Sequence, residues 1–126
     1  MVVFSLVVSL FIILIDIMKA MPQPRLDPQV MRASAGEAAG VMKALANPER
    51  LLLLCEMSQG EVGVSELEAR LGIQQPTLSQ QLGVLRRQGL VETRRDGKQV
   101  FYRVADARVL ALLRTMYAQF CPKDVA

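Results

Sequence analysis

The chain has 126 residues, enough for one compact domain and too few for two. It contains no histidine and two cysteines, so the usual ligand sets for zinc, copper or nickel are missing, and neither a metal nor another cofactor is expected. The formal net charge is only +3, but seven bases against two acids between Arg70 and Arg103 leave a local balance of +5, which suits a polyanionic partner.

The first segment, residues 2–18, is almost wholly apolar and just short of the ~20 residues that a membrane span needs. A secretory signal is not expected, because no lysine or arginine precedes the apolar run and no clear cleavage site follows it. We prefer the interpretation that translation begins at Met18 or Met21. The alternative is a membrane anchor, after which Lys19 and Arg25 would keep the rest of the chain in the cytoplasm. The sequence thus divides into an N-terminal segment (1–21), a proline-rich linker (22–28) and a folded domain (29–126).

Two helices are predicted next, each with its own start signal. The pair Asp27-Pro28 is typical of an N-cap and a first helical position, and apolar residues then recur at helical spacing as far as Ala46. The pair Asn47-Pro48 repeats this signal and opens a second helix. Residues 51–55 are continuously apolar, so the second helix should be largely buried.

A short third helix and a fourth helix follow, joined by a tight turn. Ser65 and Glu68 are spaced as a capping box that would open the third helix, residues 66–71, and Gly72 would end it. Pro76 starts the fourth helix, whose leucines recur at spacings of four and three and leave small polar residues on the other faces.

A β-hairpin and a last helix complete the chain. Residues 90–95 and 99–104 are rich in strand formers and are separated by Asp96 and Gly97, a strong hairpin signal. Asp106 can cap a last helix, whose broad apolar face exceeds what a small core can cover, so we expect a homodimer. The order of elements, ααααββα, predicts a mainly helical winged helix-turn-helix with a small β-hairpin.

Small polar residues surround the start of the fourth helix, which this geometry places in the major groove of DNA. Amides there can pair with adenine edges, and hydroxyls can reach phosphates or bases. Cations at the hairpin tip can meet the DNA backbone or a minor groove. The predicted DNA-binding residues are Gln74, Gln75, Thr77, Ser79 and Gln80 of the helix, and Arg94, Arg95 and Lys98 of the hairpin.

The sequence strongly resembles the ArsR/SmtB family of bacterial repressors in three stretches. They are residues 44–51 (Ala-Leu-Ala-Asn-Pro-Glu-Arg-Leu), 75–85 (Gln-Pro-Thr-Leu-Ser-Gln-Gln-Leu-Gly-Val-Leu) and 89–92 (Gly-Leu-Val-Glu). The resemblance extends over about residues 30–121. It implies a cytoplasmic repressor, a homodimer built from the first and last helices of the domain, and a double-stranded operator with two half-sites.

Family members that detect arsenic carry cysteines in the third-helix region, where this chain has none between Glu61 and Leu67, and those that detect zinc use histidines. The placement of Cys55 and Cys121 is instead similar to that of a persulfide- and redox-sensing subgroup. The resemblance implies that reactive sulfur species or an oxidant bridge the two cysteines by a disulfide or polysulfide, which releases the operator and induces sulfide-oxidation genes. From the residues alone, packing of both thiols in the core is an equally good interpretation.

Two other functions remain open at this point. The first is a winged helix that binds another protein, with or without a membrane tether, and whose cysteines only pack. The second, a thiol enzyme, is disfavoured because both cysteines lie near predicted helix C-termini and no histidine can act as a base.

Overall fold

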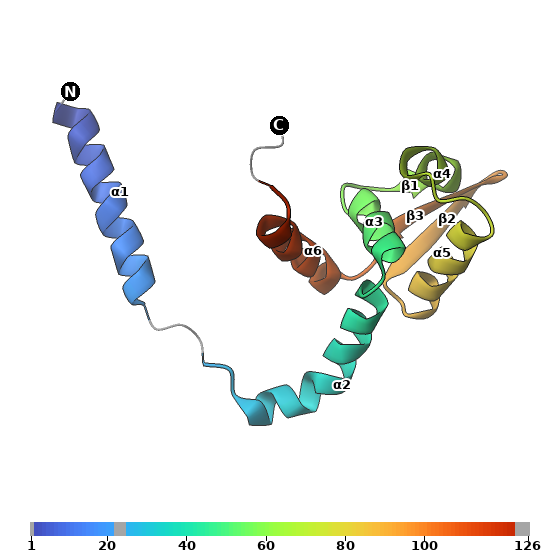
Figure 1. The fold of residues 1–126 in the computed structure, drawn as a ribbon, viewed down its shortest axis with the longest axis horizontal. Coiled ribbons are helices and arrows are strands. Elements are labelled where there is room, and N and C mark those ends of the chain that lie inside the picture. Colours follow the sequence, from blue (N-terminus) through green and yellow to red (C-terminus); the bar gives the residue numbers. More distant parts are fainter. Residues whose placement is uncertain (1, 22–24, 123–126) are drawn as a thin grey trace. The chain divides into compact units, whose positions relative to one another are not determined.

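The computed structural model describes residues 2–21 and 25–122. The chain forms two compact units, residues 1–34 and 35–126. Figure 1 shows the elements along the chain. The helices are α1 (Val2–Ala20), α2 (Pro28–Leu45), α3 (Pro48–Met57), α4 (Val64–Leu71), α5 (Thr77–Arg87) and α6 (Ala107–Phe120), and the strands are β1 (Val62–Gly63), β2 (Val91–Asp96) and β3 (Gln99–Val104).

The N-terminal helix α1 has 19 residues, none of them buried. At ~1.5 Å per residue it is roughly 29 Å long, close to the ~30 Å hydrocarbon core of a bilayer. With a hydropathy of 2.5 it is long and apolar enough to cross a membrane, judged by length and composition. The linker predicted over residues 22–28 is described only from Arg25 onward, and its last residue, Pro28, already begins α2.

Most helix ends lie where the short-range signals predict them. The Oδ1 atom of Asn47 accepts a hydrogen bond from the backbone N of Arg50 (3.1 Å) and caps α3. The Oδ1 atom of Asp106 accepts one from the backbone N of Arg108 (2.8 Å) and caps α6. Gly72 ends α4 with a φ of 67°, a left-handed conformation that favours glycine.

The start of α4 differs from the prediction. The helix begins at Val64 rather than at position 66, Gly63 precedes it, and no side chain caps it, so the predicted capping box of Ser65 and Glu68 is wrong. The cause is the strand β1, which the sequence analysis missed. Its two residues pair with Tyr102 and Phe101 of β3, and the chain passes directly from this strand into the helix.

The predicted hairpin is part of a three-stranded antiparallel sheet in the order β1-β3-β2. Val91 pairs with Val104 at one end of the hairpin, and Asp96 pairs with Gln99 at the other. The two turn residues are therefore Gly97 and Lys98, one position later than the predicted turn. Gly97 has a φ of 63°, which a two-residue hairpin turn requires and glycine allows.

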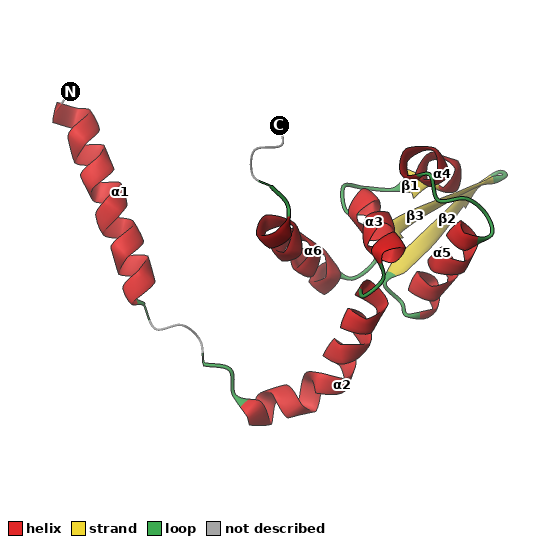
Figure 2. Ribbon diagram, viewed as in Figure 1, coloured by secondary structure: helices red, strands yellow, loops and turns green. Residues whose placement is uncertain are grey.

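Helices α3, α4 and α5 pack against one another and against the sheet, as Figure 2 shows for the second unit. Six leucines of these helices are part of the core, and five of them, Leu53, Leu54, Leu67, Leu78 and Leu85, have no exposed surface. The side of α5 that carries Leu78 and Leu85 is thereby fixed inward, and its opposite side faces solvent. The short helix, turn, second helix and β-wing confirm the predicted winged helix-turn-helix.

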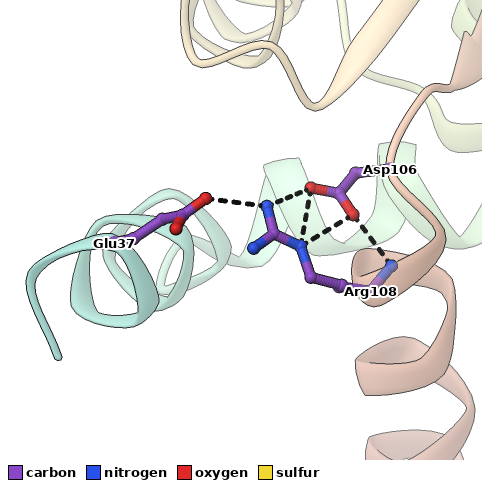
Figure 3. A network of polar contacts seen from close by, with 3 residues as sticks. All are labelled: Glu37, Asp106 and Arg108. Carbon is purple, nitrogen blue, oxygen red and sulfur yellow. Dashed lines mark hydrogen bonds and ion pairs between the residues drawn. The ribbon is translucent and has the colours of Figure 1, made fainter. Parts of the chain in front are cut away.

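One arginine joins α2 to the start of α6. Arg108 Nη2 lies 3.0 Å from Glu37 Oε1 of α2 and 2.8 Å from Asp106 Oδ2 (Figure 3). These hydrogen bonds raise the pKa of Arg108 above its usual range, and the bond from Arg108 lowers the pKa of Asp106. Because Arg108 and Glu37 are largely exposed, the ion pair between them contributes little to the stability of the fold.

Candidate DNA-binding surface and cysteine site

The polar residues predicted to read DNA lie in the turn before α5 and in its first two turns. Gln74, Gln75, Ser79 and Gln80 are exposed, whereas Thr77 is half-buried. The Oε1 atom of Gln75 accepts hydrogen bonds from Ser79 Oγ (2.5 Å) and Ser79 N (3.2 Å). Gln75 and Ser79 therefore hold each other at the start of the helix. Within the described residues, the side chains of Gln74 and Gln80 form no hydrogen bond and are available to a ligand.

Arg50 of α3 connects α5 to the end of α2 through hydrogen bonds. Its Nη1 atom donates to Gln81 Oε1 of α5 (3.0 Å), and its Nε and Nη2 atoms donate to the carbonyl oxygens of Ala44 (2.5 Å) and Lys43 (3.3 Å) at the end of α2. The guanidinium thus donates to two carbonyl oxygens in the last turn of α2 and also to a side chain of α5. The sequence analysis gave Arg50 no function, although Arg50 lies in the stretch that carries the family resemblance, one turn after the N-cap Asn47.

The wing contains one predicted DNA-binding cation that is already paired. Arg94 Nη2 lies 2.6 Å from Glu61 Oε1, and the guanidinium lies 4.7 Å from the ring centre of Phe101. Its hydrogen bonds lower the pKa of Glu61. Lys98 in the turn and Arg95 at the end of β2 are exposed, and within the described residues neither forms an ion pair.

The positive charge inferred from the sequence is partly neutralised by the fold. Of its seven bases, Arg70 pairs with Glu56 and Glu66, Arg94 with Glu61, and Arg103 with Glu92. Four bases have no ion pair with any described residue. They are Arg86, Arg87, Arg95 and Lys98. The sequence analysis missed Arg86 and Arg87 as candidates, although they follow Ser79 and Gln80 by seven residues, two helical turns further along α5.

The two cysteines lie on neighbouring elements of the second unit. Cys55 is on α3, and Cys121 is the C-cap of α6, where its backbone N donates to the carbonyl oxygen of Tyr117 (2.9 Å). Both are half-buried free thiols. The side chain of Tyr117 borders a pocket of about 260 Å³ that Cys55 also borders. The lining residues are Cys55, Ser58 and Gln59 of the α3 end and Leu113, Arg114 and Tyr117 of α6.

The electrostatics of Cys55 also indicate that the thiols are near each other. Burial raises the pKa of the Cys55 thiol, and negative charge on Cys121 and on Glu56 raises this pKa further. The use of the two thiols as a switch stays a prediction. No group of three or more potential metal ligands occurs among the described residues.

Comparison with known proteins extends this description. Residues 47–93 match the model of the bacterial regulatory proteins of the arsR family. A biofilm growth-associated repressor of Agrobacterium fabrum is 55% identical over 94 residues, which are 75% of this chain and 80% of that protein.

Two solved structures have the same fold. The crystal structure of the transcriptional repressor BigR from Xylella fastidiosa aligns with a TM-score of 0.75 at 48% identity, over 78% of this chain and all of that one (100%). A homodimeric winged helix-turn-helix DNA-binding domain from Mycobacterium bovis aligns with a TM-score of 0.61 at 34% identity, over 80% of this chain and 94% of that one.

Proposed function

Since the chain belongs to the ArsR family of bacterial regulatory proteins and is a DNA-binding transcriptional repressor of this type, we propose that it binds its operator as a homodimer and releases it when Cys55 and Cys121 become linked. The observation that carries the proposal is the pocket lined by residues of α3 and α6: Cys55 borders it, and Cys121 ends the helix that supplies Leu113, Arg114 and Tyr117 to its lining. In this proposal the helix that carries Cys55, α3, packs against the same hydrophobic core as the DNA-reading helix α5.

The exposed side of α5 enters the major groove in this proposal. Gln74 and Gln80 contact base edges, while Gln75 and Ser79 position the start of the helix against phosphates. Arg95 and Lys98 of the wing contact the DNA backbone, because they are the wing cations without a carboxylate partner among the described residues.

The homodimer forms through α2 and α6. Met42 of α2 and Phe120 of α6 are 57% and 83% exposed, although large apolar side chains at helix surfaces favour burial. A second copy of the chain covers them, as in the homodimeric relative from Mycobacterium bovis. Such a dimer presents two copies of α5 about one DNA turn, ~34 Å, apart.

A link between the cysteines changes this spacing. The thiolate of Cys55 attacks the outer sulfur of a persulfide R–S–SH, the S–S bond breaks, and RS⁻ leaves and takes up a proton. The thiolate of Cys121 then attacks the Cys55 sulfur and displaces HS⁻, so one persulfide oxidises two thiols to a disulfide and becomes a thiol and hydrogen sulfide. A further sulfane sulfur would give a polysulfide bridge.

The link ties α3, which supports α5 through Arg50, to α6 of the dimer interface. A coupling of ~1–3 kcal/mol between the link and DNA binding would weaken operator affinity about 5- to 150-fold. Release of the operator in the cytoplasm would induce genes that detoxify sulfide or persulfide, which is the response that this chemistry serves.

The test is a fluorescence anisotropy titration with DNA from upstream of the protein's own gene. Reduced protein is expected to bind tightly, and persulfide-treated protein at least fivefold more weakly. Cys55→Ser and Cys121→Ser should bind like the reduced protein whether treated or not. Equal affinity of reduced and treated protein would refute the switch, and salt-insensitive or absent DNA binding would favour a protein-interaction module instead.

A further inference from the structure

A cation borders the same pocket as Cys55. Arg114 of α6 lines the pocket together with Cys55, Ser58 and Tyr117. We propose, on the basis of the proposed function, that this pocket selects small organic persulfides that carry a carboxylate. Arg114 binds the carboxylate while the outer sulfur reaches the Cys55 thiol.

The size of the pocket limits the ligand. Its volume is about 260 Å³ and it is open to solvent, whereas sites for drug-sized ligands occupy ~300–1,000 Å³. Leu113 and the ring of Tyr117 offer apolar contact for a short carbon chain, and Ser58 and Gln59 offer polar groups. A persulfide with a chain of a few carbon atoms fits this space, and its charged end would reach the pocket mouth.

Arg114 is available to an external anion because no carboxylate among the described residues compensates its charge. Arg70, Arg94, Arg103 and Arg108 each pair with a carboxylate, and no described carboxylate lies within ion-pair distance of Arg114. The guanidinium is exposed and planar, so it can bind a carboxylate through two parallel hydrogen bonds.

An anionic donor needs this cation. Glu56 follows Cys55 directly, and its negative charge acts on the thiol, so it would also repel an approaching carboxylate. Glu56 Oε2 lies 3.2 Å from Nη1 of Arg70, which is a residue of α4. Arg114 is the cation on the pocket side, where it offsets the repulsion and orients the donor.

The reaction is the first step of the proposed switch. The Cys55 thiolate bonds to the outer sulfur of the donor, the S–S bond of the donor breaks, and the donor leaves as its thiolate and is protonated by water. No further oxidant or reductant is needed, because the sulfane sulfur is transferred from one thiolate to another. Arg114 is a positioning residue, since it contacts only the carboxylate of the donor.

The experiment measures how fast Cys55 gains one sulfur atom, followed by intact-protein mass spectrometry in a Cys121→Ser background that stops at this step. Two donors of matched length are compared. One is the persulfide of mercaptopropionate, which ends in a carboxylate, and the other is the persulfide of mercaptopropanol, which ends in a hydroxyl. Arg114→Gln should slow the carboxylate donor about two- to fivefold, the range of an exposed ion pair, and leave the hydroxyl donor unchanged. Arg114→Lys should restore part of the difference, and Arg32→Gln, an exposed arginine of α2, serves as the matched control.

Equal slowing of both donors, or no slowing of either, would overturn the inference while leaving the proposed switch intact. Failure of Cys55 to accept sulfur from either donor in the unsubstituted pocket would overturn both. Far-ultraviolet circular dichroism of each variant separates a folding defect from a loss of selectivity.

Discussion

Because Arg94 is paired with Glu61, we predict that the other cations of the wing bind the DNA phosphates. Lys98→Gln removes from each protomer one cation that has no ion pair with any described residue, and therefore two such cations from each dimer. Since every neutralised phosphate contributes ~0.9 to the slope of log K against log salt, the slope should become shallower by about 1.8. When KCl is raised from about 50 to about 200 mM, the operator affinity of the parent should therefore fall by a factor about 12 times larger than that of the variant.

Arg94→Gln provides the matched comparison on the same wing. The guanidinium of Arg94 is held by Glu61 and lies over Phe101, so its removal should change the slope much less than that of Lys98. Both slopes come from anisotropy titrations of reduced protein over a series of KCl concentrations. An equal change for the two variants, or an unchanged slope for Lys98→Gln, would refute the assignment of Lys98 as the phosphate contact and Arg94 as part of the sheet.

Three further predictions concern stability, the thiol pair and the N-terminal helix. Arg50→Met should destabilise the fold by about 1–3 kcal/mol, because it leaves carbonyl oxygens and Gln81 without their charged donor; urea unfolding at one protein concentration measures this, and unchanged stability would contradict it. Cys121→Ser should lower the pKa of Cys55, so that alkylation of Cys55 reaches half of its maximal rate at a lower pH than in the parent; an unshifted profile would mean that the thiols do not interact. Deletion of residues 2–18 should leave the operator affinity of reduced protein unchanged, since no residue of α1 is buried, and a tenfold loss would show that α1 takes part in DNA binding.

The parts of the fold that depend on neighbouring residues could be predicted from the sequence. The caps at Asn47 and Asp106 and the left-handed glycine that ends α4 each need only a residue and the next turn of chain. The strand β1 could not be predicted, because a two-residue strand has no pattern and owes its existence to pairing with β3, almost forty positions later. The wrong capping box follows from the same missing contact.

In the candidate site, too, features set by neighbouring residues could be predicted, and contacts between distant residues could not. The sequence predicts that α5 reads DNA and that Cys55 and Cys121 form the thiol pair, but it does not show which cations are neutralised. The pair of Arg94 with Glu61 joins residues 33 positions apart, and only the fold makes Arg114 of α6 and Cys55 of α3 line the same pocket. The net positive charge counted along the sequence therefore overstates the positive electrostatic potential of the wing.

The central claim is tested most directly by one sample measured in three states. Protein in which mass spectrometry maps a link between Cys55 and Cys121 within one chain is titrated with operator DNA, reduced, and titrated again alongside protein that was never linked. We predict at least fivefold weaker binding of the linked form and full recovery on reduction. A mapped link with undiminished operator affinity would contradict the proposed coupling of the thiol pair to the reading helix.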